Sequence, residues 1–335
     1  MTDTSSTSSG GRPAAAPGSG ALAGIMLTLG AILLILMIGF GVRSTFILSL
    51  AGYTCAFALF ALSINLMLGG LGEVPLGQCI FFGVGAYGTA MLTIEAGVPF
   101  VAAVPVAMAA SAVLAIGIGW LTLRLTGAYF SIVSWGLAGV MMVAAMNLEV
   151  TGGPLGLFGF PSLTVGPVDL TEPQSYFFFT AVILLLVLAF LARVRSSRFG
   201  HAIESIRQSR HLAQSVGVDV FRERLKMLVL SAPVAALAGA LCLPYTQIVT
   251  PEVFSVVLTV DALLAVLIGG TGLLFGPVIG TAIFTILPQF LKLDPNVKVL
   301  VFSLAIILVM MLAPGGLHQI GRAVMARLTR GEGGR

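Results

Sequence analysis

Residues 45–68 read TFILSLAGYTCAFALFALSINLML, a run that contains no charged side chain. An α-helix needs about 20 predominantly apolar residues to cross a hydrocarbon core of about 30 Å. The rest of the chain after residue 20 is built from similar apolar runs, separated by short polar segments. Strands that span a membrane would alternate polar and apolar residues instead. The pattern therefore predicts an all-α integral membrane protein.

The composition excludes a water-soluble protein. Of the 335 residues, 58% are hydrophobic and only 9% are charged, whereas soluble domains carry about 25% charged residues. The third, eighth and ninth apolar runs are short or interrupted by glycine, so we expect some of them to break or re-enter. We expect about ten membrane segments with 8–10 full crossings, over 21–42, 45–68, 76–95, 98–123, 126–147, 175–192, 225–245, 257–272, 275–291 and 297–313.

The chain ends differ from this apolar body. Residues 1–20 are rich in Ser, Gly, Ala and Pro and predict a disordered N-terminal cytoplasmic tail. Residues 21–320 form the expected transmembrane domain, which includes a cytoplasmic loop over 193–226, and 321–335 form a basic C-terminal cytoplasmic tail. The three cysteines stand singly in apolar runs, without the spacing of a metal site or a disulfide framework.

Basic residues fix the expected orientation, because Lys and Arg concentrate in cytoplasmic loops. Ten crossings with both termini in the cytoplasm place 14 Lys and Arg residues inside and three outside. The segment 151–175, which has Asp169 and Glu172 but no basic residue, then lies outside. The net charge of +4 follows from this topology. No aromatic platform accompanies the basic residues, so we expect no nucleic-acid partner.

Glycine patterns favour helix packing. Gly83, Gly85 and Gly88 spell the G-x-G-x-x-G of dinucleotide-binding folds, but they lie in an apolar run without the required preceding strand. Small residues at such spacing let two membrane helices approach closely. Gly272, Gly276 and Gly280 recur at every fourth position and predict one flat helix face.

One internal echo points to a transport path. Residues 68–73 (LGGLGE) resemble 268–273 (IGGTGL), and each follows an apolar span and precedes an interrupted one. Broken helices at corresponding positions of two halves mark translocation sites in transporters, although chance similarity is the rival in a chain with 41 glycines. Intramembrane polar groups are candidates for the same role. We expect Glu73, Gln78, Tyr87 and Asp261 along the path.

Enzyme chemistry has no visible site in this sequence. His201, His211 and His318 lack a carboxylate or serine constellation. None of the lysines is followed by Ser or Thr, so the phosphate-binding loop G-x-x-x-x-G-K-[ST] is absent. We therefore expect no cofactor or metal in this chain, and any ATP used must be bound by another subunit.

The loop 193–226 is the most informative polar region, with eight basic and three acidic side chains. From His201 to Val216, the residues Ala202, Ile206, Ala213 and Val216 share one face of a helical wheel, which predicts a single amphipathic helix. Gly217 supplies a C-terminal stop. Spacing alone leaves two roles open, docking into a soluble partner or lying on anionic lipid.

Six stretches resemble, in the same order, the motifs of LivM-type permeases of branched-chain amino-acid ABC importers. The resemblance covers residues 66–314. The stretches are LGQCIFFGVGAY (76–87), GAYFSIV (127–133), TGGPLG (151–156), SRFGHAIESIR (197–207), AQSVG (213–217) and GGTGLLFGP (269–277).

The resemblance implies a permease subunit in a bacterial inner membrane. Its expected partners are a second permease, two cytoplasmic ATPases that bind ATP and Mg²⁺, a solute-binding protein and membrane lipid. Transport of urea, short amides or small aromatic carboxylates is the alternative, and a stand-alone secondary transporter or channel is the rival. Leu212 stands where the family usually has alanine. The residues implied in coupling to the ATPase are Arg198, Glu204, Ile206, Arg207, Ala213 and Gly217.

Overall fold

The computed structural model describes residues 44–160, 164–165, 168–291 and 297. Six helices in this part of the chain are long and apolar enough to cross a membrane, which confirms the all-α membrane fold. The expected first span, the tenth span apart from Val297, and both tails lie outside the described residues. The total of about ten segments and the cytoplasmic location of both termini therefore stay predictions.

The eight expected spans between residues 45 and 291 all correspond to helices. The long ones are α2 (Thr45–Asn65), α3 (Cys79–Ile94), α4 (Phe100–Thr122), α5 (Ala128–Asn147), α6 (Pro173–Arg195) and α9 (Val220–Thr246). A π-helical turn, η1 (Leu66–Leu71), extends α2, and a 3₁₀ turn, η2 (Leu76–Gln78), precedes α3. The last two, α10 (Val256–Gly269) and α11 (Gly276–Leu291), have 14 and 16 residues. The expected shortness of the eighth and ninth segments is confirmed.

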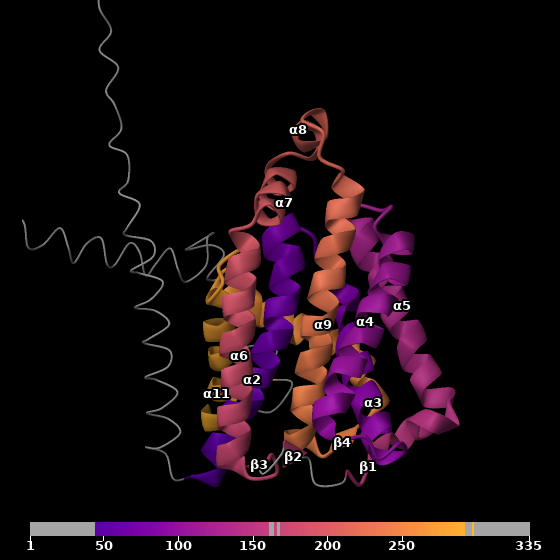
Figure 1. The fold of residues 1–335 in the computed structure, drawn as a ribbon, viewed down its shortest axis with the longest axis vertical. Helices are drawn as coiled ribbons and strands as arrows, with labels where there is room; N and C mark the ends of the chain where they lie inside the picture. The colour runs from indigo at the N-terminus through magenta and orange to yellow at the C-terminus, as the bar shows by residue number, and fades with distance from the viewer. Residues whose placement is uncertain (1–43, 161–163, 166–167, 292–296, 298–335) are drawn as a thin grey trace, which may run out of the picture. The chain divides into compact units, whose positions relative to one another are not determined.

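Short elements close the two ends of the helical unit. At one end, β1 (Leu157–Phe158) pairs antiparallel with β4 (Ile248–Val249), and β2 (Thr164–Val165) pairs with β3 (Val168–Asp169). The opposite end carries α7 (Arg198–Gln208) and α8 (Arg210–Ser215) (Figure 1). The remaining short turns are η3 (Glu149–Thr151), η4 (Gly153–Leu155) and η5 (Pro251–Phe254).

The long helices divide into an inner and an outer set. In their most apolar 18-residue windows, 72–83% of the residues of α2, α3 and α9 are buried, against 22–33% in α4, α5 and α6. The outer helices are as apolar as the inner ones, because lipid tails and a protein core are equally apolar surroundings. Burial in this protein is therefore decided by packing and not by polarity.

Glycines set the closest helix contacts, as the G-x-G-x-x-G interpretation predicts. A Cβ atom at Gly85 would overlap the Ala236 backbone of α9, and one at Gly239 would overlap the Phe82 carbonyl of α3. Gly83 faces the Phe254 ring, and these glycines let α3 and α9 cross with their backbones nearly touching.

The second glycine series needs a correction. Gly276 and Gly280 lie on α11, and a Cβ at Gly280 would overlap the carbonyl of Ala265 on α10. Gly272 does not share their face, because α11 begins only at Gly276. With a φ of +77°, Gly272 lies in the turn between α10 and α11, a conformation that favours glycine.

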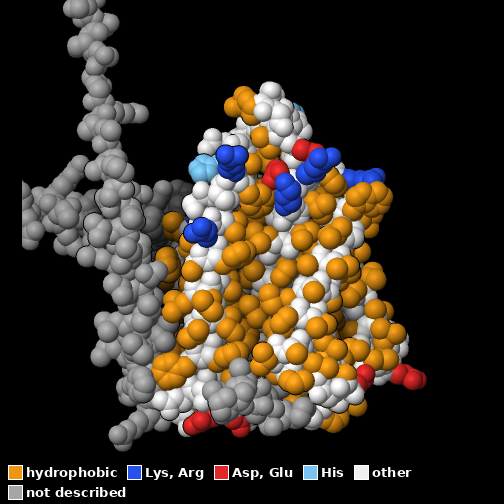
Figure 2. Space-filling model, viewed as in Figure 1, with side chains coloured by type: hydrophobic (Ala, Val, Ile, Leu, Met, Phe, Trp, Pro, Cys, Tyr) orange, Lys and Arg blue, Asp and Glu red, His pale blue; other side chains and the backbone are white. Residues whose placement is uncertain are grey.

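Charge separates the two ends of the described unit. Lys and Arg side chains gather, with a few acidic ones, at the end that carries α7 and α8, whereas the described part of the opposite end shows acidic but no basic side chains in this view (Figure 2). The basic positions lie at the end of α4, the end of α6, α7, α8 and the start of α9. We call this the basic end, and under the positive-inside rule it is the expected cytoplasmic end.

Candidate functional site

The two glycine-rich breaks of the sequence echo meet at the basic end. The amide of Asn65, at the last residue of α2, donates to the Leu273 carbonyl at 2.9 Å and accepts from the Gly272 N–H at 3.0 Å. Gly69 in η1 packs so closely that a Cβ there would lie 2.6 Å from the Gly272 nitrogen. The structure therefore brings together two segments about 200 residues apart in the chain.

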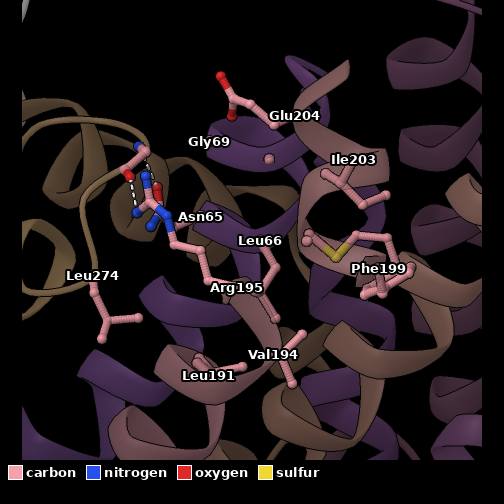
Figure 3. Close-up of a pocket in the computed structure, with 14 residues that line it drawn as sticks. Asn65, Leu66, Gly69, Leu191, Val194, Arg195, Phe199, Ile203, Glu204 and Leu274 are labelled. Atoms are coloured by element: carbon pink, nitrogen blue, oxygen red, sulfur yellow. Dashed lines mark hydrogen bonds between the residues drawn. The ribbon is translucent and has the colours of Figure 1, made fainter. Parts of the chain in front are cut away.

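Helices α6 and α7 close over this junction. The Arg195 guanidinium at the end of α6 donates to the Gly272 carbonyl (Figure 3). A cavity of about 80 Å³ is lined by both the junction and α7, with Phe199 and Ile203 on its α7 side. Glu204 extends away from Asn65 and Arg195 at the rim of this cavity (Figure 3).

Glu73 lies at the basic end, in a buried charge cluster. One carboxylate oxygen, Oε1, accepts from Arg210 of α8 and from Arg224 of α9, each at 2.6 Å. Glu73 is 1% exposed and Arg224 is 3% exposed. Arg224 also donates to the carbonyls of Leu123 at 2.7 Å and Leu125 at 2.9 Å. The cluster ties the start of α8 to the turn after η1, to α9 and to the segment that follows α4.

The folding of the segment before α3 explains why Glu73 reaches this cluster. Gly70 and Gly72 weaken the end of α2, which widens into the π-helical turn η1. Gly72 then adopts a φ of +73°, which turns the chain and places Glu73 in the interior. Arg210 and Arg224 were not among the site residues predicted from sequence. An acidic residue directly after a glycine-rich segment, in a chain whose arginines concentrate in the loop 193–226, was the available signal.

The loop 193–226 holds two helices where one was expected. Ser209 is extended, with φ −161° and ψ 113°, and its hydroxyl accepts from the Leu212 N–H as the N-cap of α8. The single helix over His201–Val216 is therefore wrong, because the backbone cannot stay helical through an extended residue. The C-terminal stop is confirmed, since α8 ends at Ser215 and Gly217 has a φ of +87°.

The break at Ser209 changes which side chains face outward. Ile206 and Ala213, predicted to share one face of the helix, are both buried within this chain. Val216 was expected on the same face, but it is 72% exposed, and Leu212 is 67% exposed. Leu212, on α8, and Val216, which follows α8 directly, are therefore exposed apolar side chains, and α8 lies at the tip of the basic end (Figure 1). Arg198, Glu204 and Arg207 are exposed on α7, and Gly217 is exposed after α8.

Gln78 and Tyr87 are buried between helices. The Gln78 amide donates to the Ser231 hydroxyl of α9 at 3.2 Å. The Tyr87 ring stacks on Phe254, with 5.6 Å between ring centroids. Within the described chain, the Gln78 Oε1 atom and the Tyr87 hydroxyl have no hydrogen-bond partner. Both side chains therefore keep an unused polar atom in an apolar interior.

Asp261 lies on a larger cavity, of about 600 Å³. The cavity is walled by α2, α3, α9 and α10, and its polar lining includes Tyr53, Thr250, Glu252 and Ser255. The first turns of α3 and α10 meet beside it, where the Cys79 N–H donates to the Thr259 hydroxyl at 3.1 Å. Gln78 and Asp261 thus belong to neighbouring elements, whereas Glu73 is bound to arginines at the basic end. Among the described residues, no group of His, Cys, Asp and Glu is placed to hold a metal.

Comparisons with known proteins give the family that the chain resembles. The family described as branched-chain amino acid transport system / permease component matches residues 46–313. Proteins named high-affinity branched-chain amino acid transport system permease protein LivM, from Salmonella typhimurium and from Escherichia coli, are each 26% identical over 297 residues, which cover 82% of this chain and 70% of theirs. A probable LivH permease of Methanocaldococcus jannaschii is 28% identical over 138 residues, 40% of this chain and 43% of its own. No solved structure gave a significant match.

Proposed function

We propose a role in solute import on the premise that this chain belongs to the family of branched-chain amino acid transport permeases. It is the membrane-spanning permease subunit of an importer for branched-chain amino acids or related small solutes. Two cytoplasmic ATPase subunits bind ATP and Mg²⁺, and a solute-binding protein delivers the solute. The relatives named LivM and LivH support pairing with a second, similar permease. The complex resides in a bacterial inner membrane.

The exposed tip of α8 carries this proposal. Contiguous apolar patches on a protein surface mark sites of interaction with a partner, and we take the exposed apolar pair at this end as part of such a site. Leu212, on α8, and Val216, directly after α8, are 67% and 72% exposed and stand four positions apart in the chain. A groove on an ATPase subunit that receives this helix would bury both side chains.

The Glu73 cluster supplies the route from the ATPase to the membrane interior. Arg210 is the first residue of α8, so a displacement of α8 moves the guanidinium that holds Glu73. Glu73 is followed within five residues by η2 and Gln78, at the broken start of α3. Coupling therefore passes from α8 through the ion pair to the segment that precedes the expected path.

The solute path runs beside the broken starts of α3 and α10. The cavity that Asp261 lines supports this placement, because it combines polar groups with apolar walls at the depth of a helix break. The outward side of α10 and α11 exposes Val257 and Ile279, by 60% and 55%. We propose that the second permease covers this side, so that the solute crosses between the two chains.

The test is substrate-stimulated ATP hydrolysis and uptake in proteoliposomes that contain this chain, the second permease, the ATPases and the binding protein. Leucine, isoleucine and valine are compared with urea, acetamide and benzoate. We expect Leu212→Asp to lower stimulated hydrolysis at least about tenfold, because burying a leucine side chain contributes about 2 kcal/mol. The matched control is Gln214→Asp, which adds the same charge to an exposed polar position on α8.

Two outcomes would overturn parts of the proposal. Equal loss of stimulation in Leu212→Asp and Gln214→Asp would show that charge on α8, and not its apolar tip, matters for docking. Solute movement by this chain alone and without ATP would replace the importer with a secondary transporter or channel.

A further inference from the structure

The arginines at the basic end divide into bound and unbound groups. Among the described residues, the side chains of Arg193 and Arg198 make no hydrogen bond, ion pair or cation–π contact, and Arg207 is likewise unpaired. The other cations are engaged: Arg195 with Gly272, Arg210 and Arg224 with Glu73, Arg222 with Asp219, Lys226 with Glu223, and Arg124 over the Trp120 ring.

Arg193 and Arg198 line the same cavity, of about 670 Å³, where α6, α7 and α9 meet. Lys226 also lines it, but its charge is offset by Glu223 at 2.7 Å. The cavity therefore has two unbalanced positive charges. Its walls are otherwise mostly apolar, formed by Phe190, Val194, Phe199, Ala202 and Leu230.

An apolar stripe on α6 leads to this cavity from the membrane interior. Val182, Leu186 and Phe190 follow one another at intervals of four residues and are 51–64% exposed. Residues four apart lie on one face of a helix, and Arg193, three residues after Phe190, continues that face. The space-filling view shows basic side chains above a broad hydrophobic surface (Figure 2). A ligand here meets cations at one end and exposed hydrocarbon-facing side chains at the other.

We propose that this cavity binds the headgroup of an anionic phospholipid from the cytoplasmic leaflet. The phosphate lies between Arg193 and Arg198, and the acyl chains run along Val182, Leu186 and Phe190. Basic pockets between membrane helices on the cytoplasmic side bind acidic headgroups in this way. A soluble anion would use the cations but leave the apolar walls uncovered. The inference rests on membrane insertion and does not depend on the transported solute.

The test is native mass spectrometry of the purified full chain, titrated with phosphatidylglycerol or with phosphatidylcholine of the same acyl chains. We expect phosphatidylglycerol to bind more tightly. Each cation near the surface contributes about fivefold in affinity, so Arg193→Gln with Arg198→Gln should weaken phosphatidylglycerol binding about thirtyfold. The control, Arg207→Gln, removes an unpaired arginine that does not line the cavity, and it should weaken binding by less than the about fivefold expected for one cation at the site.

A conservative pair, Arg193→Lys with Arg198→Lys, separates loss of charge from loss of fold, because it should retain binding. The proposal is overturned if the two lipids bind equally, or if the double Gln variant binds as the wild type does. It is also overturned if inorganic phosphate displaces the lipid, since the cavity would then be a site for soluble anions. Lipid binding is measured on the purified chain without the ATPase subunits. A negative result therefore concerns the lipid site alone and is distinct from a negative result for coupling to ATP hydrolysis.

Discussion

Replacing Glu73 by Gln should destabilise the protein more than any change at an exposed acid. The side chain is 1% exposed, and its Oε1 atom lies 2.6 Å from two guanidinium groups. Glutamine keeps the shape but removes the charge, which leaves Arg224 buried and uncompensated at 3% exposure. Breaking a buried ion pair by removing one partner costs about 3–5 kcal/mol. We expect the cost here near the lower limit, because the amide oxygen of glutamine can still accept a hydrogen bond from the arginines.

The loss of stability should be smaller for Arg210→Gln than for Glu73→Gln, because Arg210 is more exposed to water. The Arg210 side chain is 32% exposed, so water screens its charge and Arg210→Gln should cost only about 1 kcal/mol. At about 2 °C per kcal/mol, Glu73→Gln should lower Tm by roughly 6 °C and Arg210→Gln by roughly 2 °C. The double variant should fall short of the sum, because both changes remove the same interaction.

Thermal unfolding can be followed with a thiol-reactive fluorophore. Cys79 and Cys242 are buried free thiols, so they react when the helices separate. All variants are heated at one rate, since unfolding of a membrane protein in detergent is often irreversible. Glu204→Gln, at an exposed position on α7, is the control and should stay within about 1 °C. If the Tm of Glu73→Gln also stays within about 1 °C of the wild-type value, the buried cluster does not stabilise the protein.

Three further changes test the packing and the path. Gly239→Leu should abolish stable folding, because even a Cβ there overlaps the α3 backbone, whereas Gly136→Leu, with open space around it, should fold normally as judged by size-exclusion profiles. Asn65→Leu should lower the free energy of unfolding by about 1–3 kcal/mol, because the Gly272 N–H loses its acceptor. An unchanged Tm in the thiol assay would contradict this. Asp261→Asn should change uptake kinetics at unchanged Tm, and unaltered uptake would remove Asp261 from the path.

Much of the fold was predictable from residue patterns. Every apolar run between residues 45 and 291 became a helix, and the three runs expected to be short or interrupted gave α3, preceded by the turn η2, and α10 and α11. The stop at Gly217 was predictable because few other residues adopt a positive φ at a helix end. The helix break at Ser209 was missed, because helical periodicity alone does not register one extended residue. Serine three positions before Leu212 was the available N-cap signal.

The candidate site was only partly predictable. Ile206 and Ala213, predicted to share one helix face, are both buried, but Val216, predicted on the same face, is exposed, since the extended residue Ser209 separates α8 from α7. Glu73 was identified as unusual, yet its partners were not. Arg210 and Arg224 are 137 and 151 positions away in the chain, and no periodicity connects them to it.

The sequence by itself determined that this protein enters a membrane, where its helices lie and which end carries its basic residues. These properties depend on the free energy of transferring each apolar segment from water into lipid and on the charges beside that segment. Both are set by the residues of the segment itself, without the rest of the fold. The tertiary structure decided which helices are inner and which outer, that the two glycine breaks meet through Asn65, and that Glu73 holds α8. Lipid and protein interior are equally apolar, so hydropathy cannot distinguish an inner helix from an outer one. Only the close fit of glycine faces and the pairing of buried charges make that choice.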